Sequence, residues 1–187
     1  LKHIPKWKIR LEIKGGICYT FISPIFDGKE IDQRRWIMTK EDRKNAYLYC
    51  KFRDEQFALY DEYAKRHGMM MKTLLVVNVL FYAKEGLTQT EICQRTFQSK
   101  QTVNVIIKSL LEDQYVTVAE MPENRRNKLV QMTEAGRTYC EKVVRHITWA
   151  EDTAMSMFTP EEQKRLIDLS RTFTKNLTLL VNQETED

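Results

Sequence analysis

Residues 88–132 read TQTEICQRTFQSKQTVNVIIKSLLEDQYVTVAEMPENRRNKLVQM, and this stretch decides the fold. Its first part predicts a short helix over Gln89–Phe97, because Thr88 can cap that helix with its hydroxyl while Glu91 reaches back to the open amide. Gly86 suits the C-terminal stop of a preceding helix. A helix must therefore end just before Thr88, and a second one begins there.

The next helix follows a short turn and has Ser99 as its cap. Apolar residues recur at the spacing of one helix face and predict a buried stripe of Val103, Ile106, Ile107 and Leu110. The opposite face is polar and carries Lys100, Gln101, Asn104 and Lys108. In a DNA-recognition helix such side chains reach base edges, where Gln and Asn can pair with adenine and Lys with guanine or phosphate. A solvated face, which any surface helix has, is the alternative.

A hairpin is predicted after this helix, over Tyr115–Ala119 and Lys128–Met132. Period-two positions place Val116 and Val118 against Val130 and Met132. The tip between the strands is rich in turn residues and ends in Arg125 and Arg126, which suit phosphate contact or a narrow minor groove. Helix, turn, helix and basic-tipped hairpin together indicate a winged helix-turn-helix that binds duplex DNA.

These motifs resemble the MarR (multiple antibiotic resistance regulator) family of bacterial transcription factors. The resemblance rests on Gly86–Ile92, Ser99–Asn104 and Asn124–Gly136, and extends over about Lys40–Gln183. It implies a homodimer with intertwined terminal helices, whose two lobes bind a pseudo-palindromic operator, more often as a repressor than as an activator. Family members often release DNA when a small aromatic or anionic compound binds between the lobe and the dimer helices.

Carried over by position, the resemblance implies a set of DNA-contacting residues. The residues expected to meet the major groove are Ser99, Lys100, Gln101, Thr102, Asn104 and Lys108, and the wing arginine is Arg126, with Arg125 beside it. Three positions depart from the family pattern. Met121 and Asn124 stand where acidic residues are common, and Gln114 stands where glycine usually follows the recognition helix. These departures put the salt-bridge geometry of the wing in doubt, and not the fold.

Flanking helices complete the expected fold, which is mainly α with a small two-stranded β wing. The lobe spans about residues 72–132 and includes a nearly all-apolar helix over Lys72–Lys84, too short to cross a bilayer. Dimerisation helices are expected over about 41–67 and 134–183, with the start signal Thr159-Pro160-Glu161-Glu162 inside the second range. Apolar stripes on these helices are Leu48, Phe52, Phe57, Tyr60 and Ala64, then Tyr139, Val143, Ile147 and Ala150, then Leu166, Leu169, Phe173, Leu177 and Leu180. A subunit interface is the favoured reading of these stripes, and an intrachain core is the alternative.

The first 37 residues do not fit this domain of residues 38–187. Gln33-Arg34-Arg35-Trp36-Ile37 can be encoded by a purine-rich ribosome-binding sequence just ahead of Met38, so residues 1–37 are expected to be a non-native leader read in frame. A β-hairpin extension is the alternative, because Trp7–Lys14 and Ile17–Ile22 alternate around Gly15-Gly16.

The net charge of the chain gives little support for DNA binding by itself. The whole chain is +4, but residues 1–37 hold eight basic and four acidic side chains, which leaves 22 of each sign in the rest. The expectation of DNA binding therefore depends on where the charges lie, and the basic residues on the expected contact surface are Lys100, Lys108, Arg125, Arg126 and Lys128. No secretory signal or transmembrane segment is recognisable, which favours a cytoplasmic protein.

Other functions were weighed against DNA binding. No phosphate loop, catalytic triad order, HExxH motif or paired carboxylates occur, so neither an enzyme, a cofactor nor a metal site is expected. Cys50, on the first helix, offers a redox-sensing alternative, with an inert thiol as the default. Met69, Met70 and Met71, with Tyr82 and Trp149, are candidate ligand-lining residues, and ordinary core packing, the favoured alternative, explains them at least as well. A winged helix used for protein contacts is a further alternative, which salt-dependent DNA affinity would exclude.

Overall fold

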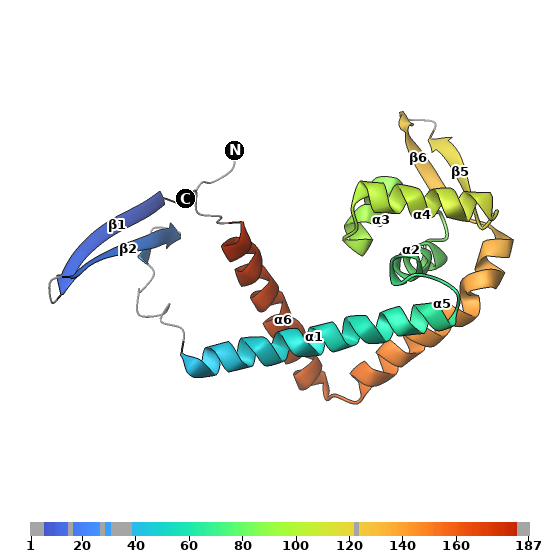
Figure 1. The fold of residues 1–187 in the computed structure, drawn as a ribbon. Coiled ribbons are helices and arrows are strands. Elements are labelled where there is room, and N and C mark those ends of the chain that lie inside the picture. The colour runs from blue at the N-terminus through green and yellow to red at the C-terminus, as the bar shows by residue number, and fades with distance from the viewer. Residues whose placement is uncertain (1–5, 15–16, 27–28, 31–38, 122–123, 183–187) are drawn as a thin grey trace. The chain divides into compact units, whose positions relative to one another are not determined.

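The structure, a computed structural model, describes residues 6–14, 17–26, 29–30, 39–121 and 124–182, with side chains over 39–120 and 128–182. These residues form six helices and six strands (Figure 1). The chain divides into two compact units, residues 1–59 and 60–187.

The first unit contains a small sheet and the beginning of a long helix. Strands β1 (Lys6–Lys14), β2 (Ile17–Phe26) and β3 (Lys29–Glu30) pair in the antiparallel order β1-β2-β3. The pairing of β1 with β2 agrees with the β-hairpin alternative for residues 1–37. It does not tell whether these residues belong to the native protein, so the leader hypothesis stays a prediction. The ribosome-binding motif Gln33–Ile37 lies outside the described residues. Helix α1 (Lys40–Arg66) crosses into the second unit, and none of residues 39–59 is buried.

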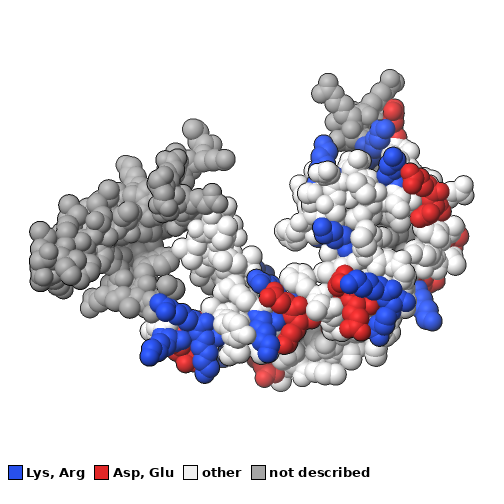
Figure 2. Space-filling view, in the orientation of Figure 1, with Lys and Arg blue, Asp and Glu red and all other residues white. Residues whose placement is uncertain are grey.

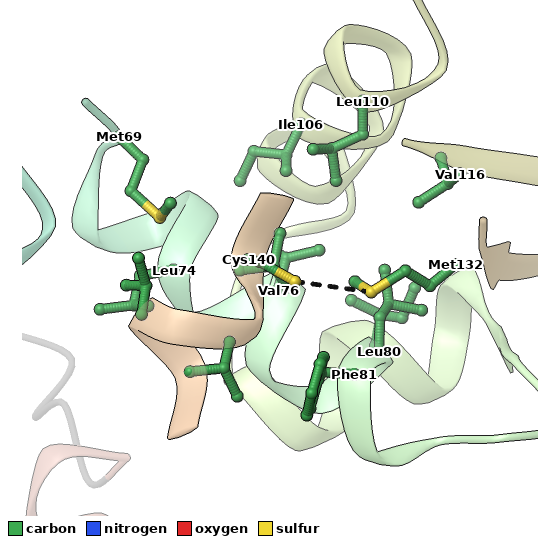
Figure 3. Close-up of a cluster of buried hydrophobic side chains, with 14 of the residues drawn as sticks. Met69, Leu74, Val76, Leu80, Phe81, Ile106, Leu110, Val116, Met132 and Cys140 are labelled. Atoms are coloured by element: carbon green, nitrogen blue, oxygen red, sulfur yellow. Dashed lines mark hydrogen bonds between the residues drawn. The ribbon is translucent and has the colours of Figure 1, made fainter. Parts of the chain in front are cut away.

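A single apolar core lies at the centre of the second unit. Helix α2 (Met71–Tyr82) buries Leu74, Val76, Val77, Leu80 and Phe81, which confirms the predicted buried central helix, although it ends two residues early. Figure 3 shows Leu74 and Leu80 in one cluster with side chains of α4, the wing and α5. The Cys140 thiol of α5 lies 3.6 Å from the Met132 sulfur at the end of the wing. The wing and α5 are thus parts of the same core.

The helix pair forms as the sequence predicts. Helix α3 (Gln89–Thr96) starts with a capping box, in which the Thr88 hydroxyl accepts a hydrogen bond from Glu91 N and the Glu91 carboxylate accepts one from Thr88 N. Helix α4 (Lys100–Glu112) buries all four predicted stripe residues, Val103, Ile106, Ile107 and Leu110. Phe97 ends α3 in the left-handed region, at φ 54°, which turns the chain toward α4.

The wing is larger than predicted. Strands β5 (Val116–Met121) and β6 (Asn124–Met132) pair in the expected register, with Val116 opposite Met132 and Val118 opposite Val130. A third strand, β4 (Leu87–Thr88), was not predicted; it joins the outer edge of β6 and gives the order β4-β6-β5.

Gly86 has a different role from the one predicted. Helix α2 is capped at Ala83 rather than at Gly86. Gly86 has φ +80°, and a Cβ there would lie 2.7 Å from the carbonyl oxygen of Val130. Glycine is needed because the chain enters β4 in close contact with β6, so the prediction of a helix stop at Gly86 was wrong.

Two helices follow the wing. Helix α5 (Glu134–Ser156) is capped by Thr133 and buries Cys140, Val143, Val144 and Ile147. Helix α6 (Pro160–Val181) begins with the predicted capping box of Thr159 and Glu162 and contains no buried residue. The four leucines of the predicted stripe of α6, Leu166, Leu169, Leu177 and Leu180, are therefore exposed in the single chain.

Candidate DNA-binding surface

The start of α4 is fixed by a local cap. The Ser99 hydroxyl accepts a hydrogen bond from Thr102 N at 3.1 Å and lies 2.9 Å from the Thr102 hydroxyl. Two of the predicted DNA contacts are thus already used to hold the first turn of the helix. Their position still matters, because the free amides of a helix N-terminus favour an anion such as phosphate.

The predicted polar face of α4 is accessible. Lys100, Gln101, Asn104 and Lys108 are all exposed, and the side that they share faces away from the buried stripe. Gln89 of α3 donates to the carbonyl of Lys100 at 3.4 Å, which ties the first turn of α4 to α3. The contact with α3 therefore holds the start of α4, and the polar side chains that it exposes, in place.

An open groove of about 440 Å³ runs between α4 and the wing. Polar side chains form its rim: Asn104 and Lys108 from α4, Glu120 and Lys128 from the wing, and Gln89 from α3. Its floor is apolar and consists of Ile107, Leu111, Val118 and Val130. Glu120 lies directly opposite Lys128 in the strand register. Neither Gln89 of α3 nor Glu120 of the wing was predicted as a site residue, since the local sequence does not show which residues of these two elements line a groove with α4.

Charge of both signs covers this part of the lobe, as Figure 2 shows for the region of α4 and the wing. Arg125 and Arg126 belong to β6, but their side chains lie outside the described residues. Their predicted DNA contacts consequently stay predictions.

A tight junction holds the wing and α4 against α5. Gln114 has φ 62°, a left-handed conformation that accounts for the usual glycine at this position. The next residue, Tyr115, accepts a hydrogen bond from Thr133 N at 3.0 Å, and the Thr133 hydroxyl donates to Gln114 O at 2.9 Å. A Cβ on Gly136 would overlap the Tyr115 carbonyl. The Tyr115 and Tyr139 rings stack with centroids 4.3 Å apart, so this junction leaves little freedom between α4 and α5.

The candidate ligand-lining residues do not converge on one described cavity. Met70 is the residue before α2 and Tyr82 is its last, which separates them by ~18 Å at the rise of an α-helix. Tyr82 lies beside α5 instead, where its hydroxyl donates to the Thr148 hydroxyl at 3.2 Å. Trp149 follows Thr148 and is 61% exposed. The Trp149 ring lies against that of His146, with centroids 5.7 Å apart, and the His146 ring stacks on Tyr63 of α1. Tyr82 and Trp149 thus have different neighbours, and Met70 lies at the other end of α2 from Tyr82.

Cys50, Cys93 and Cys140 are free thiols. Burial raises the pKa of Cys140 to about 11, so this thiol stays protonated and unreactive at neutral pH. Cys50 is half-buried on α1, in a shallow hollow lined by Tyr47, Lys51, Asp54, Glu55 and Ala58. Over the described residues, no group of three or more His, Cys, Asp and Glu side chains is placed to bind a metal ion. The described helices also include none with the length and apolar character to cross a membrane.

Comparisons with known proteins give one sequence match and many structural ones. Residues 74–127 match the MarR family. No curated protein sequence matches the chain.

The solved structures share the fold at low sequence identity. NMB1585, a MarR family regulator from Neisseria meningitidis, is 18% identical with a TM-score of 0.64, over 79% of this chain and 100% of that chain. MepR of S. aureus, solved as a DNA complex, is 18% identical with a TM-score of 0.58, over 70% and 96%. The PcaV transcriptional regulator of Streptomyces coelicolor, solved with its natural ligand, is 18% identical with a TM-score of 0.55, over 70% and 91%. The lobe over residues 74–127 is therefore a MarR family winged helix, within a chain that has the fold of MarR family regulators.

Proposed function

We propose that this protein is a homodimeric transcriptional repressor that binds a pseudo-palindromic operator in double-stranded DNA and releases it when a small aromatic or anionic ligand binds. The observation that carries the proposal is the exposed polar face of α4, which lies beside the groove shared with the wing. The DNA complex of S. aureus MepR, which has the same fold, supports it.

The groove suits a DNA strand in both shape and chemistry. If α4 enters the major groove and the wing reaches the neighbouring minor groove, the sugar–phosphate strand between the two passes between helix and wing. Lys108 and Lys128 then stand on opposite rims, where each can approach a phosphate. The apolar floor suits deoxyribose, which carries no charge.

A dimer is supported by two helical segments that contain no buried residue. Neither residues 39–59 of α1 nor any residue of α6 is buried, although α6 carries a stripe of leucines. Large apolar patches are rare on monomers and mark association sites. A twofold dimer would also present two copies of α4 to successive major grooves, about 34 Å apart.

A ligand site is supported at the α2–α5 contact. Tyr82 is exposed there and Trp149 is exposed on α5, and both rings combine an apolar face with a polar group. An aromatic ligand at this place would contact α5, the helix to which the wing is joined at Tyr115 and Thr133. PcaV was solved with its natural ligand, which supports a ligand-responsive regulator of this fold.

Fluorescence anisotropy tests the proposal on the full chain. Labelled duplex from upstream of the protein's own gene is compared with scrambled duplex over a series of salt concentrations. We expect tight binding that prefers the natural duplex and weakens as salt rises, with a logarithmic slope of about −0.9 for each phosphate neutralised. Absence of binding at low salt would favour the protein-contact alternative. Loss of binding on peroxide treatment that Cys50→Ser prevents would favour redox sensing.

A further inference from the structure

The most exposed apolar side chain of α4 stands among its polar side chains. Val105 is 61% exposed, whereas Val103, two residues earlier on the same helix, is fully buried. Val105 follows Gln101 by four residues and precedes Lys108 by three, so all three lie on one side of the helix. It also lies outside the buried core and the lining of the groove beside the wing.

The position of Val105 suits contact with a base better than contact with the backbone. It is the middle residue of this outward row and lies in the N-terminal half of α4, and the N-terminal residues of a recognition helix are the ones that contact base edges in a major groove. A branched side chain is stiff at χ1, which holds its two methyl groups in a fixed place. Valine can neither donate nor accept a hydrogen bond, so a phosphate oxygen or a bare polar base edge gains nothing from it.

We propose that Val105 is a specificity-determining residue that recognises the C5-methyl group of a thymine. This inference rests on the proposed function, because it assumes that α4 reads the major groove. Thymine is the one base that presents a methyl group there, and apolar side chains contact it. Cytosine presents an amino donor at the neighbouring position, which Val105 would desolvate without accepting a hydrogen bond. Gln101, one turn earlier, can pair with adenine, so the two residues together favour an A·T-rich half-site.

The test begins with selection of duplexes by the full chain from a randomised library. Each thymine of the selected sequence is then replaced singly by deoxyuridine, which removes only the methyl group, and the dissociation constants are measured. For the unchanged protein we expect one thymine in each half-site at which this replacement weakens binding about fourfold, the worth of one buried methyl group. The same replacement should not change the dissociation constant of the Val105→Ser variant. The Val105→Ile variant should again bind the deoxyuridine duplex more weakly than the thymine duplex.

The variants and outcomes separate the inference from the function on which it rests. Serine and valine have similar helix propensities, and Val105 is exposed, so circular dichroism should give unchanged thermal unfolding for Val105→Ser. If the unchanged protein selects no sequence, the proposed function fails. If it selects a sequence but no single thymine is sensitive, or if Val105→Ser shows the same sensitivity, the inference about Val105 is overturned and the function stands.

Discussion

At the scale of single residues, Asn104 tests whether the polar face of α4 reads bases. Its side chain is exposed and reaches the rim of the groove beside the wing. Asn104→Ala should weaken binding to the selected operator by ~1–3 kcal/mol and leave binding to random DNA nearly unchanged, because a bidentate contact to adenine carries sequence information. Anisotropy titrations with both duplexes measure the difference. Alanine favours helices, so α4 should not unfold.

Lys108→Ala is the control for Asn104→Ala. A phosphate contact has no sequence information, so this change should weaken binding to both duplexes and lower the salt slope. Equal losses on both duplexes for Asn104→Ala would refute base readout by Asn104.

Substitution of Gly136 should destabilise the fold through a steric clash. It lies in α5 against the Tyr115 carbonyl, where an added Cβ would overlap backbone that cannot move without breaking the junction to α4. Gly136→Ala should lower the free energy of unfolding by about 3 kcal/mol, at the upper end for overpacking. Urea unfolding at fixed protein concentration measures it.

Gly68→Ala provides the matched control. Gly68 has φ +73° and no atom within 4 Å of an added Cβ, so only the left-handed backbone opposes alanine, at a cost of about 1 kcal/mol. If the two variants lose similar stability, the close approach of α5 to Tyr115 is not the constraint that the structure indicates.

At the scale of helices and strands, the sequence predicted best what is decided locally. Capping boxes involve residues three apart, and the stripe of α4 follows one helical period, so Thr88, Glu91 and the stripe were placed correctly. Strand β4 was missed because two residues carry no periodicity. Gly86 was misinterpreted because the atom that requires glycine, the Val130 carbonyl oxygen, is 44 positions later in the sequence.

The capping box of α3 should make the lobe sensitive to acid. The hydrogen bond from Thr88 N, followed by that from the Thr88 hydroxyl, lowers the pKa of Glu91 below its ordinary value of 4.5. The carboxylate therefore contributes stability that is fully present above about pH 4.5 and is lost as the pH falls through the lower folded pKa. Glu91→Gln keeps an acceptor for the box but cannot titrate.

Urea unfolding of the unchanged protein and of Glu91→Gln, from about pH 3 to about pH 7, measures this contribution. The difference in free energy of unfolding between the two proteins should be constant at neutral pH and should shrink toward acid. A difference that does not change with pH would show that the Glu91 carboxylate gains nothing from the cap.

At the scale of the whole molecule, the site depends on residues that the sequence could not bring together. The α4 side of the groove was predictable, because exposed residues follow from the buried stripe. Lys128 was expected on the contact surface, whereas Glu120 joined the groove only through the strand register. Met70 and Tyr82 were grouped by chemical type, yet they lie at opposite ends of α2. Which of these residues lie together depends on contacts between segments that are distant in the sequence, and local sequence patterns do not encode such contacts.

The quaternary structure is the last expectation, and α6 offers a direct test of it. Leu169 and Leu177 are 60% and 43% exposed on the stripe that the single chain leaves uncovered. The double variant Leu169→Glu/Leu177→Glu would bury two carboxylates in a dimer interface, so sedimentation equilibrium should find a monomer. Operator affinity should fall by about 100-fold or more, because each lobe then binds its half-site alone.

Thr178→Glu is the matched control, because Thr178 is exposed on α6 but lies off the stripe. It adds the same kind of charge and should leave both the dimer and the operator affinity unchanged. Because α6 contributes no buried residue, the lobe should keep its circular dichroism spectrum in both variants. A double variant that remains dimeric would exclude this stripe as the interface and leave α1 as the other uncovered surface.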